Sequence, residues 1–194
     1  VLLKIMTGLM EPSDGIIKYG GIPLKKGQYA KDVGIVLDCI GFMPEYTAKE
    51  NLLLLAKINK KTGEERINEI LKQVGLEPDS KKVYRKFSLG MKQKLALSCS
   101  LIHKPDILFL DEPTTGVDPV SRKEFWQMLR NLRKQGITII VSTPIMDEAR
   151  QCDRIAFINH GQVHGIDTPE RILQKFASIL CPPPLEREEA QQMA

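Results

Sequence analysis

KPDILFLDEPTTGVDP, at residues 104–119, carries the clearest structural pattern in this chain. Its apolar run at residues 107–110 follows a Pro-Asp turn and is typical of a strand buried on both faces of a parallel sheet. Two carboxylates, Asp111 and Glu112, come directly after that run, and Pro113 stops the strand behind them. Because open α/β sheets bind ligands at the carboxyl ends of their strands, this pattern predicts a charged crevice at that edge.

The neighbouring carboxylates of Asp111 and Glu112 point to opposite sides of an extended chain, so they cannot act as one bidentate unit. We therefore expect them to have separate tasks, one suited to a metal ion and the other to a water molecule. The alternative is that the two side chains only cap the turn that follows the strand.

A second strand is expected beyond this turn. Pro119 is a suitable first residue for a helix that runs to about Gln135, and Gly136 closes it. Residues 137–142, ITIIVS, then form another continuous β-branched run. A strand, a helix and a second strand in this order predict two parallel strands joined by a crossover helix.

KFSLGMKQK, at residues 86–94, is the second strong signal. Ser88 has the chemistry of an N-cap for a helix over residues 89–103. The free N–H groups of the first turn, the Ser88 hydroxyl and the side-chain-free Gly90 make a seat for an anion. Alone, this is only a well-capped helix. Followed by one helix and a strand that ends in Asp-Glu-Pro, it is a compound pattern that chance rarely produces.

These segments together resemble the C-terminal two-thirds to three-quarters of the nucleotide-binding domain of ABC-type transporters. FSLGM, at residues 87–91, stands where that family has its LSGGQ signature. ILFLDEP, at residues 107–113, is similar to its Walker B strand, and GVDP, at residues 116–119, is similar to its D-loop. SLGMKQK, TTGVDP and STPIMDEARQCDR most resemble bacterial export cassettes of the ABC-2 or bacitracin-resistance type.

The resemblance implies an α/β fold, with a P-loop NTPase-like, mostly parallel sheet flanked by helices. It implies one ATP-binding domain over residues 1–180, with an inserted helical subdomain at about residues 40–100. Residues 181–194 contain a proline run and several glutamates without apolar periodicity, and they are expected to be frayed or disordered.

The first residues of the chain indicate how much of such a domain the sequence contains. Residues 1–9 have the pattern of a helix, and residues 15–19 that of a short strand before a glycine turn. In the family, the first of these follows directly on the phosphate-binding P-loop, which is not in this sequence. The sequence is therefore expected to be incomplete at its N-terminus, either a fragment of a longer protein or a remnant of such a cassette.

The activity implied by the resemblance is hydrolysis of ATP with Mg²⁺. Asp111 would hold Mg²⁺, directly or through water, and Glu112 would orient the attacking water or accept a proton from it. Asp38 follows the apolar run at residues 33–37, where the family has a glutamine that ligates magnesium, so Asp38 is the second expected ligand. A strand-end residue that merely faces solvent is an equally good interpretation of Asp38 taken by itself.

The resemblance also assigns ATP-binding residues at the start of the helix that Ser88 caps. Ser88, Leu89, Gly90 and Met91 would contact the γ-phosphate of ATP seated on a second cassette, and Asp118 would lie at that interface. Leu89 and Met91 replace a glycine and a glutamine of the family, which leaves the backbone seat intact but removes one side-chain donor.

Pro144 stands where the family usually has a histidine that contacts the γ-phosphate. Proline has no titratable group and no N–H. We expect a modified switch at this position and not an inactive site.

The composition agrees with one globular domain, since 42% of the 194 residues are hydrophobic and 27% are charged. The net charge of +4 neither requires nor excludes nucleic acid, and no nucleic acid is expected as a partner. Four cysteines without CxxC spacing are expected to be reduced thiols in a cytosol. No apolar run is as long as a membrane span or a signal peptide, so a link to a membrane would run through a partner.

The expected partners are ATP, a second ABC cassette that is identical or different, and a transmembrane permease subunit that contacts the helical subdomain. The protein is accordingly expected at the cytoplasmic face of the cell membrane. Two alternatives remain open: a soluble ABC-type ATPase acting in translation, and a non-catalytic fragment or regulatory remnant of a cassette.

Overall fold

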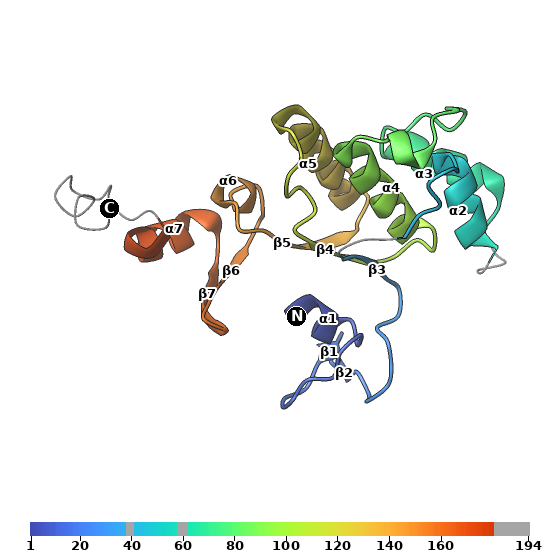
Figure 1. The fold of residues 1–194 in the computed structure, drawn as a ribbon. Helices are drawn as coiled ribbons and strands as arrows, with labels where there is room; N and C mark the ends of the chain where they lie inside the picture. The colour runs from blue at the N-terminus through green and yellow to red at the C-terminus, as the bar shows by residue number, and fades with distance from the viewer. Residues whose placement is uncertain (38–40, 58–61, 181–194) are drawn as a thin grey trace, which may run out of the picture. The chain divides into compact units, whose positions relative to one another are not determined.

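The computed structural model describes residues 1–37, 41–57 and 62–180, and the chain divides into two compact units at the bond between Ser142 and Thr143 (Figure 1). Each unit is described by itself. Asp38 and the tail at residues 181–194 lie outside the described residues. One ATP-binding domain over residues 1–180 stays a prediction.

A parallel three-stranded sheet forms the centre of the first unit. Strands β3 (Val33–Val36), β4 (Ile107–Asp111) and β5 (Thr138–Ser142) lie in the order β3-β4-β5. The middle strand holds Leu108, Phe109 and Leu110, all of which are fully buried. The prediction of a buried parallel strand in front of the acidic pair is thus confirmed.

Helix α5 (Pro119–Lys134) connects β4 to β5, and Pro119 occupies its first turn as predicted. Its buried side chains lie along one stripe: Phe125, Trp126, Met128, Leu129 and Leu132. Because β4 and β5 are parallel, with Asp111 in register with Ser142, the carboxyl ends of both strands meet at one edge of the sheet.

The helical block contains α2 (Ala48–Ala56), α3 (Glu64–Gln73) and α4 (Leu89–Leu101), with the 3-10 helix η1 (Tyr84–Lys86) in front of α4. The three α-helices contact one another, and α4 also packs on β3 and α5 (Figure 1). Their shared core consists of leucine, isoleucine and valine side chains: Leu52, Ile67, Ile70, Leu71, Val74, Leu95, Leu97 and Leu101.

A reciprocal pair of hydrogen bonds starts α2. The backbone N–H of Glu50 donates to Thr47 Oγ1 at 3.2 Å, and the backbone N–H of Thr47 donates to Glu50 Oε2 at 2.8 Å. Two N–H groups that a helix start leaves unpaired are thereby satisfied.

The N-terminal part of the first unit consists of α1 (Leu2–Met6) and an antiparallel hairpin of β1 (Lys18–Tyr19) and β2 (Ile22–Pro23). The Tyr19 hydroxyl donates to the carbonyl oxygen of Met6 at 2.6 Å and so ties the hairpin to the helix.

The second unit contains α6 (Met146–Ala149), the antiparallel hairpin of β6 (Ile155–Asn159) and β7 (Gln162–Asp167), and α7 (Pro169–Leu180). Helix α7 contacts both strands. The ring centroids of Phe157 and Phe176 lie 4.9 Å apart.

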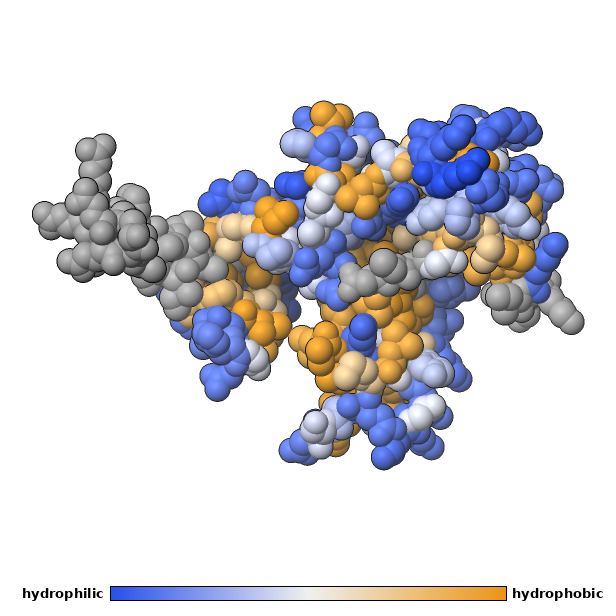
Figure 2. All heavy atoms as spheres, viewed as in Figure 1, coloured by the Kyte–Doolittle hydropathy of each residue, from blue (hydrophilic) through white to orange (hydrophobic). Residues whose placement is uncertain are grey.

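Helices on a mainly parallel sheet confirm the predicted α/β class. Among the described residues, none of the helices has the length and apolar character needed to cross a bilayer. On the face shown in Figure 2, hydrophilic residues gather over the segment that leads into η1.

Candidate functional site

Asp111 and Glu112 lie at the carboxyl edge of the sheet, as the sequence predicted. Asp111 is the last residue of β4 and is half-buried, whereas Glu112 is exposed. The backbone of Glu112 has a φ of +44°, in the left-handed region that non-glycine residues seldom adopt. Backbone strain of this kind persists only where surrounding contacts hold it, and it is common at functional sites.

Ser142, the last residue of β5, supplies such contacts. Its hydroxyl donates a hydrogen bond to Asp111 Oδ1. The backbone N–H of Glu112 donates to the Ser142 carbonyl oxygen at 3.1 Å and to Ser142 Oγ at 3.2 Å. The sequence analysis missed Ser142 as a site residue, although the parallel alignment of two strand ends is a signal for it.

Thr115 donates hydrogen bonds to the carboxylate and to the backbone carbonyl oxygen of Glu112. Its hydroxyl donates to Glu112 Oε2 at 3.0 Å, and its backbone N–H donates to the Glu112 carbonyl oxygen at 3.2 Å. A second turn follows, in which the N–H of Val117 donates to the carbonyl oxygen of Thr114 at 3.1 Å. The segment from Glu112 to Asp118 is thus a pair of hydrogen-bonded turns.

The donor set at this edge suits Mg²⁺. Mg²⁺ usually binds one or two protein carboxylates and fills its other positions with water and phosphate oxygens. Asp111 offers a half-buried carboxylate at the end of β4, and its hard oxygen atoms fit that preference. In residues 1–37, 41–57 and 62–180, no three His, Cys, Asp or Glu side chains gather in a group that could hold a metal ion.

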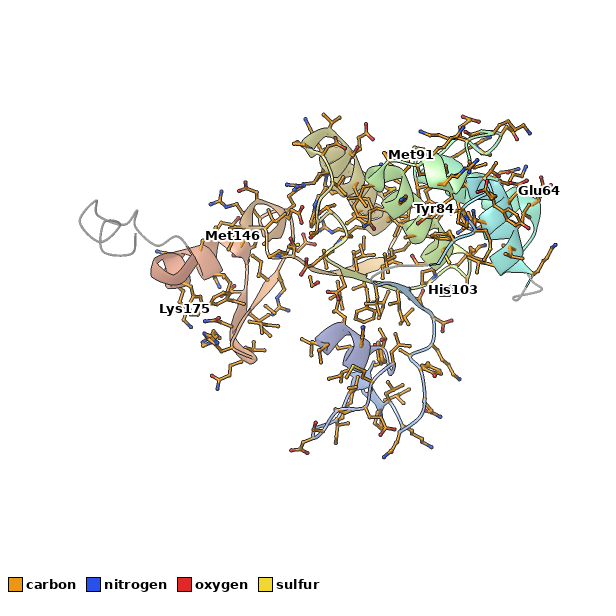
Figure 3. All side chains as sticks on the ribbon, viewed as in Figure 1. Glu64, Tyr84, Met91, His103, Met146 and Lys175 are labelled. Atoms are coloured by element: carbon orange, nitrogen blue, oxygen red, sulfur yellow. The ribbon has the colours of Figure 1, made fainter. Side chains whose placement is uncertain are left out.

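The start of α4 is exposed at Ser88 and Leu89, and Ser88 does not turn into the core. Ser88 Oγ accepts a hydrogen bond from the backbone N–H of Met91 at 3.3 Å, which confirms Ser88 as the N-cap. Met91, labelled in Figure 3, lies in the first turns of α4, and its sulfur is 3.5 Å from Lys82 Nζ.

Basic residues lead into this helix start: Lys81, Lys82, Arg85 and Lys86 precede it in the chain and are exposed. Arg85 Nη1 forms an ion pair with Glu45 Oε1 at 3.2 Å. Positive charge beside a helix N-terminus favours an anion there.

The start of α4 packs tightly on the segment that leads into α5. Gly90 is buried, and a Cβ added to it would lie 2.9 Å from Ser121 Cβ. A Cβ on Gly116 would meet Leu89 Cδ2 at 3.3 Å. An ion pair of 2.8 Å between Lys94 Nζ and Glu124 Oε2 joins the two helices further along. The structure therefore brings together the two segments that were predicted to contact a second cassette.

Asp118 is the N-cap of α5. Its Oδ1 accepts a hydrogen bond from the backbone N–H of Ser121 at 3.0 Å. This bond favours the ionised carboxylate and lowers the pKa of Asp118 from its usual value. The side chain is exposed, so the cap leaves Asp118 accessible to other groups.

Pro144 belongs to the second unit and is exposed there. The neighbouring Thr143 hydroxyl donates to Glu148 Oε2 at 2.6 Å, and the N–H of Ile145 donates to Thr143 Oγ1 at 3.1 Å. Glu148 is only 2% exposed. These bonds fix the backbone on both sides of Pro144.

Comparison with known proteins supplies independent information. A family profile described as ABC transporter matches residues 1–115, more than half of the chain. The probable multidrug ABC transporter ATP-binding protein YbhF of Escherichia coli strain K12 is 36% identical over 186 residues, which cover 93% of this chain and 32% of that protein. The bacitracin transport ATP-binding protein BcrA of Bacillus licheniformis is 38% identical over 165 residues, which cover 83% of this chain and 54% of that protein. The chain spans about a third of the first relative and about half of the second.

Solved structures of ATP-binding cassettes are similar to this chain. The dimeric post-hydrolysis state of the ATP-binding cassette MJ0796, bound to ADP and Pi, matches with a TM-score of 0.71 and 26% identity over 87% of this chain and 79% of that chain. A structure described as the ATP binding subunit of an ABC transporter matches with a TM-score of 0.72 and 27% identity over 100% of this chain and 82% of that chain.

Proposed function

Because the chain belongs to the ABC transporter family, we propose that it binds and hydrolyses ATP, with Mg²⁺, to drive export across a membrane. The observation that carries the proposal is the arrangement at the end of β4. There a half-buried aspartate and an exposed glutamate are neighbours, and their two carboxylates accept hydrogen bonds from different hydroxyls.

Glu112 is proposed as the catalytic residue. Its carboxylate would orient the attacking water or accept a proton from it. The hydrogen bond from Thr115 restricts the carboxylate, and its exposure leaves room for a water molecule. Asp111 would hold Mg²⁺, with Asp38 as a second ligand. When bound, Mg²⁺ neutralises charge on the phosphate groups.

The start of α4 would bind the nucleotide of a second cassette. Ser88, Leu89, Gly90 and Met91 would form the seat, with the Asp118 segment beside it. The exposed N-cap, the Lys82 side chain at Met91 and the tight packing on α5 support a preformed surface for an anion.

Pro144 would lie near the γ-phosphate as a modified switch, in place of a titratable side chain. The hydrogen bonds of Thr143 support a fixed backbone for this role.

A permease subunit in the membrane would contact the helical block. Through this contact it would receive the conformational change that ATP hydrolysis drives. This chain would then lie at the cytoplasmic face of the membrane, held there through that subunit. The names of the relatives support export, since they include bacitracin transport and Nod factor export proteins.

Substitution of the glutamate tests the proposal. In the full-length protein, Glu112→Gln keeps the shape of the side chain but cannot accept a proton, so turnover of ATP should fall on the order of 10²-fold or more. Binding of ATP, measured by equilibrium titration, should remain. Asp14→Asn, in an exposed loop of the same unit, is the matched control and should leave turnover unchanged. Normal turnover in Glu112→Gln would contradict the proposed role.

A further inference from the structure

We propose that Ser142 is a positioning residue for the reaction, because its hydroxyl and its carbonyl oxygen together set the relative orientation of Asp111 and Glu112. This inference rests on the proposed function and adds a residue from a different strand to the site. Ser142 would touch neither ATP nor the attacking water, and it would act only through the two acidic residues.

The hydrogen bonds form a directed chain. The N–H of Glu112 donates to Ser142 Oγ at 3.2 Å, and the Ser142 hydroxyl in turn donates to Asp111 Oδ1. A hydroxyl can do both at once because it has one donor hydrogen and two lone pairs. The bond engages Oδ1 of Asp111 and so restricts the rotation of the carboxylate that would hold the metal ion.

The backbone of Glu112 explains why such a support is needed. A left-handed conformation at a non-glycine residue is unfavourable and relaxes unless other contacts prevent it. The N–H of Glu112 is shared between the carbonyl oxygen and the hydroxyl of Ser142. Loss of the hydroxyl removes one of these contacts and the restraint on Asp111 together.

Thr138 provides the matched control on the same strand. It lies four residues before Ser142, so both side chains project from the same face of β5. Thr138 is in register with Ile107, at the far end of β4 from Asp111, and it is exposed. Thr138→Ala therefore removes a hydroxyl from β5 without reaching the acidic pair.

The experiment compares Ser142→Ala, Ser142→Thr and Thr138→Ala in the full-length protein. Two experiments are made on each variant: steady-state kinetics, which give kcat and KM for ATP with Mg²⁺, and hydrogen–deuterium exchange of the backbone amide of Glu112 without nucleotide. Ser142→Ala should lower kcat on the order of tenfold to 10²-fold, since misplacement of reacting groups by about 1 Å has effects of that size. Its KM should stay within about twofold, and the Glu112 amide should exchange faster.

Ser142→Thr keeps a hydroxyl on a residue that suits a strand, so kcat and slow exchange should both be restored. Thr138→Ala should match the wild type in both measurements. If Ser142→Ala does not fold, Ser142→Cys keeps the side-chain shape with only a weak donor and should show the same loss of kcat.

The outcomes separate this inference from the proposed function. If Glu112→Gln loses turnover while Ser142→Ala matches Thr138→Ala in kcat and in exchange, the role of Ser142 is wrong and the function stands. If Glu112→Gln keeps full turnover, the proposed catalytic residue is wrong. Faster exchange in Ser142→Ala would then report a structural contact only, which also overturns a positioning role.

Discussion

Gly90 and Ser121 approach each other so closely that a Cβ on Gly90 would lie 2.9 Å from Ser121 Cβ. Gly90 is in the first turn of α4, and Ser121 is in the first turn of α5, the helix that Asp118 caps. The glycine of the signature-like motif is therefore required for packing inside one chain, whatever its backbone binds.

Gly90→Ala should destabilise the protein. Overpacking of a tight contact costs about 1–3 kcal/mol, while the gain in helix propensity from glycine to alanine is at most about 1 kcal/mol. We expect the free energy of unfolding to fall by about 1–2 kcal/mol, as measured by urea denaturation of the full-length protein.

Ser121→Gly is the control for that contact, since it removes the opposing Cβ and keeps the backbone N–H that Asp118 binds. In this background, the cost of Gly90→Ala should be smaller by at least about 0.5 kcal/mol. An equal cost in both backgrounds would show that the contact with Ser121 is not the cause.

Asp118 should make stability depend on pH. Its pKa in the folded protein is lowered by the hydrogen bond from Ser121, so the ionised carboxylate stabilises the fold. This contribution is complete above the ordinary aspartate pKa of about 3.9 and is lost as the pH falls through the lower folded value. Asp118→Asn keeps a capping side chain without the charge.

Urea denaturation at a series of pH values checks this prediction. The difference in unfolding free energy between wild type and Asp118→Asn should be constant near neutral pH and shrink below about pH 4. A difference that does not change between neutral pH and pH 3 would exclude a charge effect at this cap.

Pro144→His tests the modified switch. A histidine restores the side chain that the family usually has at this position, and the backbone on both sides is held by Thr143. We expect ATP turnover in the full-length protein to be at least that of the wild type. A large loss would mean that residue 144 does not lie at the γ-phosphate.

Short sequence patterns were sufficient to predict the parallel strands of the first unit and the helix between them. The sequence predicts a parallel pair from the apolar run of β4, Pro119 at the start of α5 and the β-branched run of β5. The structure confirms this pair, with Asp111 in register with Ser142. Thr47 and Glu50 likewise predict their own hydrogen bonds, because the capping partners are three residues apart.

Contacts between residues far apart in the chain could not be predicted from the sequence. Ser142 lies 31 positions after Asp111, and only the closed sheet brings their side chains together. The packing of Gly90 on Ser121 also depends on how α4 and α5 meet. The hairpin at β1 and β2 was predicted as one strand and a turn, because β2 has two residues and one is Pro23, which cannot donate to a ladder.

The site residues differ in the same way. Asp111, Glu112 and Ser88 were predicted because strand ends and helix caps leave short, local patterns, and Asp118 was predicted from the resemblance of its motif to the family. Thr115 was not predicted as a site residue, and its hydrogen bond to Glu112 accompanies the left-handed backbone of that glutamate. Such a conformation has no signature in a Glu-Pro sequence.

We propose that Glu112 acts on the ATP of its own copy, while Ser88 contacts the ATP of a second copy. Mixed dimers of two full-length variants test it. Ser88→Asp retains a good N-cap and adds a negative charge that repels phosphate, and Glu112→Gln removes the base.

ATP turnover is measured for each variant alone and for the mixed dimer, purified through two different tags. If Ser88 contacts the ATP bound to the other copy, both substitutions lie at the same ATP site of the mixed dimer. The second ATP site then has neither substitution. Turnover of the mixed dimer should then be well above that of either variant alone. A mixed dimer as inactive as both parents would contradict it.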